Sequence, residues 1–471
     1  MIKRANRYLV DGMPSMSMLC SVLKEHLANV PRLERLRRYY SGESAIMSRT
    51  RASGLPNNRI SHPYARYIVS VATGYLAGQP VSYSVDGDGD ALRPISEAYD
   101  RCEIHSVDAE NARHASIYGR AIEYIHAEAV TDAYGNERGV QPCAVALPTE
   151  QAFVVYDDDY HISPLFGVYY APNTNANGKQ DGYRIWVSGT EIVREYLAKD
   201  LITAQMEIVN ETRHYFGGVP MVEYWNDEDE RGDFEWVIPL IDAYDKLESD
   251  RVNDKEQFVD KLLLLTGCTI EQDELGRPPW QQLREDKALC LPDMQAKAEY
   301  LQGALTESDV EVLRSALIAD IHKMSMIPDL SDRDFAQNSS GVAMRYKLWG
   351  LEQLTNIKQQ WFTEGLRSRL RLFANFSRIQ GNPALDVDSV KIIMTRAMPA
   401  NALEYAELAQ MAEAAGAASL ETKVRILHSA DAWTDDMVDA EVERIKSDTA
   451  DRTPSINALL GATAENPEVV E

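Results

Sequence analysis

The chain has 471 residues, which is long enough for roughly two to four domains with sizeable cores. Its hydrophobic content of 45% and charged content of 26% are ordinary for a soluble protein, and no apolar run approaches the ~18 residues of a membrane span. The formal net charge of −25 argues against a protein that grips nucleic acid tightly through basic patches.

The N-terminus has no apolar signal-peptide segment, so we expect no secretion. The five cysteines are scattered and odd in number, which predicts reduced thiols in a cytosolic protein. They are Cys20, Cys102, Cys143, Cys268 and Cys290.

The first third of the chain is predicted to be mainly helical. Residues 1–30 carry little signal, and Pro31 begins a first short helix because proline is tolerated in a first turn. Further helices are predicted at 62–76, 91–103 and 106–118, with a strand at 81–85.

Residues 120–225 form a stretch of different character, in which β-branched and aromatic runs alternate with turn signals. Strands are predicted at 121–128, 144–147, 153–156, 165–170, 183–187, 202–208 and 221–224. We expect a strand-rich layer packed against the N-terminal helices, and therefore an α+β fold that is mainly helical.

A helix is predicted from Ile238 to about Leu265, and its middle, Glu248 to Glu256, is nearly devoid of apolar residues. Such a helix suits a wall between neighbouring subunits and a solvent channel better than the interior of one domain. Residues 268–300 are irregular, and Thr306 is a good cap for a helix that reaches residue 325.

The most informative stretch runs from Met326 to Gly381. A polar loop containing Pro328 leads to Ser339 and Ser340, either of which can cap a helix. No proline follows until Pro383, and apolar residues recur at helical spacing, which predicts a helix of about 40 residues and roughly 60 Å. Its stripe comprises Val342, Tyr346, Trp349, Leu351, Leu354, Ile357, Trp361, Leu366, Leu370 and Phe373. So long a helix needs neighbours along its length, from its own chain or from other copies.

Beyond Gly381 we expect a short strand at 390–394, three helices near 400–415, 418–429 and 434–448, and a disordered tail.

Several segments, in order, resemble the portal proteins of tailed bacteriophages, in the branch with long tails. The segments are Tyr39–Gly42, Pro56–Arg59, Thr73–Val81, Leu240–Asp254, Ile327–Asp332 and Asn338–Glu352. The resemblance covers roughly residues 31–395. It implies a ring of about 12 copies at one capsid vertex of the virion, built in the host cytoplasm, through which double-stranded DNA is packaged and ejected.

The resemblance also implies a division of the subunit into regions named wing, stem, clip and crown. The implied regions are 1–235, wing; 236–266, first stem helix; 267–305, clip; 306–325, second stem helix; 326–340, tunnel loop; 341–395, long helix and wing return; 396–450, crown; and 451–471, disordered tail. The implied partners are the terminase, a head-completion adaptor, and the major capsid and scaffolding proteins, with no membrane.

Site residues follow from the same resemblance. For the tunnel loop they are Asp329, Asp332, Arg333, Asp334, Gln337 and Asn338; for the channel-facing stem Glu248, Asp250 and Asp254; and for the clip Glu271, Asp273, Arg277, Trp280 and Arg284. An acidic channel wall repels phosphates, so DNA can slide past it. The long helix is locally basic, and we expect its cations to pair with acids of neighbouring subunits rather than with phosphate. These cations are Arg345, Lys347, Lys358, Arg367, Arg369, Arg371 and Arg378.

No sequence motif of an enzyme or metal site is present: the chain lacks a Walker A loop, a Gly-x-Ser-x-Gly elbow, Cys-x-x-Cys and His-x-x-x-His. We therefore expect no catalytic residues, cofactor or metal. Asp86–Asp90 with Glu97 imitates a calcium loop, but Ala91 replaces the required glycine, so a solvated turn is favoured there and at Asp157–Asp159. We interpret the isolated His62, His105 and His322 as structural.

Two alternatives remain open at this point. One is a metal-dependent nuclease that works through Asp329, Asp332 and Asp334. The other is an oligomeric scaffold of non-phage function, which would have no central channel.

Overall fold

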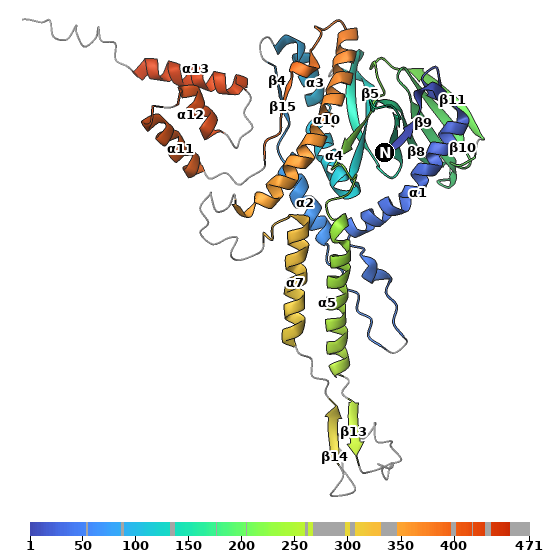
Figure 1. Ribbon diagram of the computed structural model, residues 1–471. Helices are drawn as coiled ribbons and strands as arrows, with labels where there is room; N and C mark the ends of the chain where they lie inside the picture. Colours follow the sequence, from blue (N-terminus) through green and yellow to red (C-terminus); the bar gives the residue numbers. More distant parts are fainter. Residues whose placement is uncertain are drawn as a thin grey trace, which may run out of the picture. The chain divides into compact units, whose positions relative to one another are not determined.

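A computed structural model describes residues 1–52, 55–85, 89–131, 137–175, 177–203, 205–259, 262–266, 297–301, 307–330, 346–396, 402–416, 418–428 and 435–452. The chain divides into two compact units. The first comprises Met1–Arg37, Arg66–Glu235 and Met326–Glu471, and the second comprises Arg38–Ala65 and Trp236–Ser325. Helices and largely antiparallel sheets occur together, which confirms the predicted α+β class (Figure 1).

The larger sheet of the first unit has six strands in the order β1-β7-β8-β9-β10-β11. Their bounds are β1 Ile2–Arg4, β7 Ala152–Asp157, β8 Pro164–Thr174, β9 Gln180–Ser188, β10 Ile192–Ala198 and β11 Met206–Arg213. All neighbours are antiparallel except β1 and β7, which are parallel. Helix α1 (Met16–Tyr40) lies against this sheet, and Leu19, Leu23, Phe153 and Phe166 share one core (Figure 1).

Two strand predictions need correction. No strand was predicted at the position of β10, and the strand predicted at 202–208 lies at Met206–Arg213. Strand β10 carries Arg194 and Glu195 at its centre, where they pair with Glu211 of β11 and Arg184 of β9. Strand β11 is the edge of the sheet and almost wholly exposed. Neither strand therefore shows the apolar alternation on which the prediction depended.

The N-terminal segment is more ordered than predicted. Helix α1 begins at Met16, not at Pro31, and continues through that proline. Buried Val22 and Leu36 anchor the helix on either side of it, so packing offsets the hydrogen bond that proline removes. Strand β1 and the short pair β2 (Leu9–Val10) and β3 (Met13–Pro14) also lie where no element was predicted.

The second sheet of the first unit has three strands in the order β12-β5-β6. Their bounds are β5 Arg120–Thr131, β6 Glu137–Leu147 and β12 Met221–Trp225, and the helices that contact them are α3 Arg93–Arg101, α4 Ile104–Tyr118 and α10 Trp349–Ile379. Helix α10 passes very close to β12, because a Cβ atom built on Gly365 would lie 2.4 Å from the Tyr224 ring. A glycine is therefore required there.

Other predicted elements of the first unit are confirmed. They are α2 Tyr64–Ala77, β4 Ser82–Ser84 and its partner β15 Lys391–Ile393. The short 3-10 helices described are η1 Asn6–Tyr8, η3 Gly89–Ala91 and η5 Val387–Ser389 in the first unit, η2 Ala45–Ser48 in the second, and η4 Glu235–Val237 at the point in the sequence where the first unit passes into the second.

The long helix is shorter than predicted. Helix α10 has 31 residues, or about 46 Å, and a turn at Leu348 separates it from the helical residues Tyr346 and Lys347. Residues 341–345 lie outside the described part of the chain. Four of the nine stripe residues that the structure describes are buried, including Leu366 and Phe373, whereas Tyr346 and Trp349 are 77% and 61% exposed.

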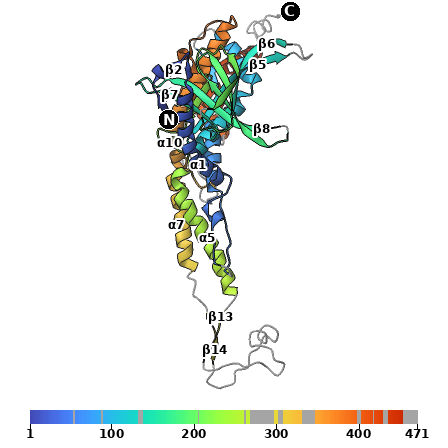
Figure 2. The ribbon, with the colours of Figure 1, turned by 90° about the vertical axis from the view of Figure 1, so that its right-hand side faces the viewer.

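The second unit contains two long helices that run side by side, α5 (Ile238–Val259) and α7 (Glu307–Ser325) (Figures 1 and 2). Helix α5 ends earlier than predicted, because Leu262–Thr266 forms strand β13, which pairs with β14 (Lys297–Leu301). A run of leucines suits a helix or a buried strand equally well, so periodicity alone could not decide between them.

The three predicted C-terminal helices are confirmed as α11 Ala402–Ala414, α12 Leu420–Leu427 and α13 Asp435–Arg452. Ser419 caps α12 by accepting a hydrogen bond from the Thr422 amide, and Val424, Val438 and Val442 form a small core. The predicted disordered tail lies mostly outside the described residues. None of the described helices is long and apolar enough to cross a membrane.

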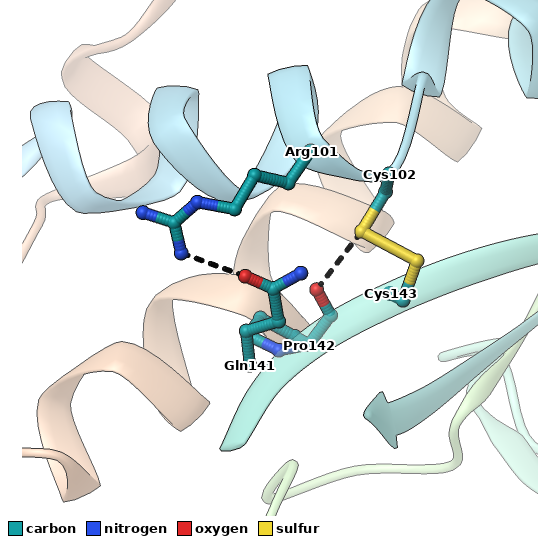
Figure 3. Close-up of a disulfide and its surroundings, with 5 residues drawn as sticks. All are labelled: Arg101, Cys102, Gln141, Pro142 and Cys143. Carbon is teal, nitrogen blue, oxygen red and sulfur yellow. Dashed lines mark hydrogen bonds between the residues drawn. A yellow bond between two sulfur atoms is a disulfide. The ribbon is translucent and has the colours of Figure 1, made fainter. Parts of the chain in front are cut away.

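The prediction of uniformly reduced thiols is wrong for two cysteines. Cys102, at the end of α3, and Cys143, in β6, form a disulfide with Cα atoms 5.6 Å apart (Figure 3). They are 41 residues apart in sequence, and only the packing of α3 on β6 brings them together. Cys20 is free, and Cys268 and Cys290 lie outside the described residues.

A buried ion cluster joins α10 to the elements around it. The Arg369 guanidinium is fully buried and donates from Nη1 to Asp108 Oδ1 at 2.6 Å and to Glu123 Oε2 at 3.1 Å. Its Nη2 donates to the Tyr83 hydroxyl at 2.9 Å, and it stacks over the Tyr99 ring at 5.2 Å. Burial raises the pKa of Glu123, and the charge of Arg369 opposes that shift.

Lys358, about three turns before Arg369 in α10, makes a second buried pair. Its Nζ donates to Ser116 Oγ at 2.6 Å and to Asp233 Oδ2 at 2.5 Å. Both cations pair within the chain, so the expectation that they pair with neighbouring subunits is wrong for Lys358 and Arg369. Arg371 also pairs internally, with Asp388 at 3.2 Å on the surface.

We predict that Arg369→Met lowers the free energy of unfolding by about 3–5 kcal/mol, because it leaves the Asp108 and Glu123 carboxylates buried without a cation. Arg371→Met is the matched control, since its pair is exposed and should contribute less than about 1 kcal/mol. Urea unfolding followed by circular dichroism measures both. Equal losses in the two variants would contradict the role given to the cluster.

Candidate functional site

The predicted site residues are only partly within the described structure. All five clip residues lie outside it, as do Asp332, Arg333, Asp334, Gln337 and Asn338 of the tunnel loop. Asp329 and the stem acids Glu248, Asp250 and Asp254 are described. The site can therefore be built up at the stem and at the start of the tunnel loop.

Glu248 belongs to an ion-pair network between α5 and α7. Its Oε1 accepts from Arg314 Nε at 2.9 Å and lies 3.8 Å from Arg251 Nη1. Glu311 on α7 binds both arginines, at 2.9 Å from Arg314 and 3.4 Å from Arg251. Two acids face two cations, so the charge of Glu248 is compensated inside the subunit.

Asp250 is compensated even more fully. Its Oδ1 lies 2.6 Å from Arg49 Nη2 and also accepts a hydrogen bond from Arg51. Both arginines come from the irregular segment between η2 and α2, within the second unit. This carboxylate ties that segment to α5.

Asp254, one turn further along α5, differs from the other two stem acids. It is half-buried and has no ion-pair partner among the residues that the structure describes. The three predicted stem acids thus separate into two structural carboxylates and one carboxylate whose charge no described cation compensates.

The polar middle of α5 has a function that the sequence analysis missed. The side chains of Asp245, Ser249 and Asn253 are buried and spaced along one helix face. Asp245 accepts from the His62 amide at 2.9 Å, Ser249 from the Ile60 amide at 3.0 Å, and Asn253 from the Asn58 amide at 2.7 Å. This face therefore satisfies the backbone of an extended segment that has no sheet partner.

His62 is structural, as predicted: its Nδ1 lies 3.0 Å from Asp245 Oδ1 and its ring packs edge-on against Tyr244. The only signal in the sequence was the recurrence of small polar residues at a spacing of four. The residues of this run were predicted to face a channel or a neighbouring subunit.

The start of the tunnel loop is anchored within the first unit. The Tyr67 hydroxyl on α2 donates to Pro328 O at 2.8 Å and accepts from the Leu330 amide at 3.1 Å, so it spans Asp329. Burial and the nearby charge of Asp329 raise the pKa of Tyr67, while its backbone hydrogen bond opposes the shift. The loop therefore leaves from a fixed point, with buried Ile327 behind it.

The stretch that imitates a calcium loop, Asp86–Asp90 with Glu97, is not supported as a metal site. Glu97 instead pairs with Arg93 and Arg101 on α3, and Asp86–Asp88 lie outside the described residues. Asp159 accepts a hydrogen bond from the Tyr160 amide, as expected for a solvated turn. Neither stretch gathers ligands in the part of the chain that the structure describes.

Comparison with known proteins supplies the family. Residues 21–455 match the profile of the family described as "Phage portal protein, SPP1 Gp6-like". The portal protein of Clostridium phage phiCD119 is 21% identical over 406 residues, which cover 82% of this chain and 84% of that protein. The portal protein of Bacillus phage SPP1 is 23% identical over 449 residues, which cover 87% and 83%. The match extends from α1 to α13 and includes both α5 and α7, so this chain belongs to the SPP1 Gp6-like family of phage portal proteins.

Proposed function

We propose that about 12 copies of this chain form a closed ring at one capsid vertex, and that double-stranded DNA passes through its axis during packaging and ejection. The observation that carries this proposal is the family match over residues 21–455. In this arrangement the protein is a conduit without a catalytic site, and the energy comes from a separate ATPase, the terminase. The family match gives no support to the nuclease or to the non-phage scaffold.

The proposed regions of the subunit keep the boundaries inferred from the sequence, with α5 and α7 as the core of the stem. Residues 267–305 would be the clip, where the terminase docks first and a head-completion adaptor later. Residues 1–235 and 341–395 would form the wing, 326–340 the tunnel loop and 396–450 the crown. The major capsid and scaffolding proteins are the remaining proposed partners, and assembly would take place in the host cytoplasm.

Exposed apolar side chains support assembly into a ring. On α7, Val312, Leu313 and Met324 are 70%, 51% and 58% exposed. Covering such side chains with a neighbouring copy removes apolar surface from water, which favours association. Contacts with neighbouring copies would therefore stabilise a stem that consists of only two helices.

Asp254 is the best-supported channel acid among the three stem candidates. Glu248 and Asp250 are neutralised by arginines of the same subunit, whereas Asp254 has no such cation among the described residues. An uncompensated carboxylate repels phosphate, so it favours sliding over binding. Asp250, in contrast, acts as a brace for the segment before α2.

Negative-stain electron microscopy of the purified protein should show rings with a central hole at least about 20 Å wide, enough for a duplex. Compact closed oligomers without a hole would contradict the conduit. If only monomers are seen, the experiment is repeated with the scaffolding protein present. The absence of rings in that second experiment would also contradict the conduit.

Asp254→Lys should slow DNA packaging by roughly tenfold at low salt, because a ring of lysines binds phosphates in a salt-dependent way. The defect should lessen as salt is raised. Glu207→Lys in the exposed edge strand β11 makes the same charge change away from the stem and should package normally. Equal packaging by the two variants, measured as DNA protected from nuclease in capsids, would remove Asp254 from the channel.

Asp250→Asn should expose the segment before α2 to trypsin at Arg49 and Arg51, because both arginines lose their shared carboxylate. Asp254→Asn changes the same helix by the same chemistry and should leave cleavage unchanged. Cleavage sites identified by mass spectrometry give the readout. If Asp250→Asn resists trypsin as the parent protein does, Asp250 is no brace.

A further inference from the structure

Four side chains with metal-ligating chemistry gather near the middle of the β5–β6 strand pair. His126 lies directly opposite Cys143 in the strand register, and Glu128 follows two residues later on the same face. A ring nitrogen of His126, a carboxylate oxygen of Glu128 and the sulfur of Cys143 all lie within 4.8 Å of one another. Cys102, bonded to Cys143, contributes a second sulfur from the end of α3 (Figure 3).

We propose that this cluster binds a zinc ion when the Cys102–Cys143 disulfide is reduced. Two thiolates, one imidazole and one carboxylate are a set of donors suited to tetrahedral Zn²⁺. The residues come from three elements, α3, β5 and β6, as in sites where a metal fixes the packing of a fold. The sequence contains no short ligand motif for this site, because its residues are brought together by strand pairing and not by proximity in sequence.

The geometry needs only small adjustments. With bonds of 2.0–2.3 Å to zinc, ligand atoms in a tetrahedron lie roughly 3.4–3.8 Å apart. The three atoms in question already lie within 4.8 Å of one another, so rotamer changes can bring them to that distance. After reduction the two sulfurs no longer share a bond and move apart to a similar separation.

Two of the ligands have polar atoms that other contacts leave available. The Nδ1 atom of His126 is buried and has no hydrogen-bond partner within the described structure. Glu128 is exposed and forms no ion pair with any described residue. An unsatisfied buried nitrogen carries a free-energy cost that a metal or a proton donor would remove.

A route for the metal is present next to the cluster. A cavity of about 500 Å³ lies between the β5–β6 strands and the larger sheet, and His126, Ala127 and Val140 line it with Trp186 and Phe376. His126 thus both lines the cavity and belongs to the cluster. A hydrated ion can reach the imidazole without opening the core.

The two states of the cluster exclude each other. A thiol reductant of the glutathione type reduces the disulfide by giving two electrons and two protons, and it becomes a disulfide itself. Zinc then displaces the two protons from the Cys102 and Cys143 thiols. In either state α3 is fixed to β6, by a covalent bond after oxidation and by the metal under reducing conditions.

The test uses the full-length chain in which Cys20, Cys268 and Cys290 are replaced by serine, so that only Cys102 and Cys143 can supply thiolates. Reduced and desalted protein is titrated with zinc chloride, and bound metal is counted with a chromogenic chelator. We expect one zinc ion per chain, none in the oxidised protein, and at least ~10-fold weaker binding in His126→Ala and Glu128→Gln. His161→Ala, an exposed histidine on another loop, is the matched control and should bind as the parent does.

A second measurement guards against loss of binding through misfolding. In the parent protein, zinc should slow alkylation of Cys102 and Cys143 by iodoacetamide, while Glu128→Gln, which changes only an exposed side chain, should reduce that protection. Reduced protein that takes up no zinc would overturn the proposal. So would uptake that is unchanged in both His126→Ala and Glu128→Gln, since the sulfurs alone would then account for it.

Discussion

The buried guanidinium of Arg369 is the interaction on which the first unit depends. Its partners Tyr83, Asp108 and Glu123 come from β4, α4 and β5, and Arg369 itself lies far along the chain in α10. Burying any one of these three charges alone would carry a large desolvation cost. Buried together, the two carboxylates and the guanidinium compensate one another. The second sheet, its helices and α10 are therefore coupled, and α10 cannot shift relative to them without exposing an unpaired charge. This makes α10 a rigid part of the first unit.

In the second unit, buried polar groups also need partners, and here the groups belong to the backbone of an irregular segment. The polar face of α5 offers side-chain oxygens to the backbone amides of Asn58, Ile60 and His62, which have no strand partner. A polar helix face is thus no sure sign of solvent. In α5 it is partly an internal surface, and the face that remains for a channel is narrower than the composition suggests. Asp254 lies one residue beyond the buried Asn253, at the border between these two uses.

Local patterns predicted the helices well and the long-range pairings poorly. Helices α2, α7 and α12 have clear start signals or periodicity, and the hairpin strands lie between turn residues. In contrast, the Cys102–Cys143 bond, the Lys358–Asp233 pair and the pairing of β13 with β14 join residues that share no local pattern. For the site, the sequence could indicate α5 and the tunnel loop, but it could not tell a braced acid such as Asp250 from a free one. That distinction depends on arginines about 200 positions away.

The difference between a compensated and an uncompensated acid matters because a ring repeats each charge once per subunit. In the proposed assembly each residue recurs about 12 times around the axis, so one uncompensated acid per subunit already makes a belt of about a dozen negative charges. At physiological salt such a belt acts over about one Debye length, ~8 Å from the wall. That range keeps phosphates off the surface of a channel only slightly wider than a duplex, and further acids add little. A subunit with a net charge of −25 can therefore neutralise Glu248 and Asp250 for stability and still present a repulsive wall.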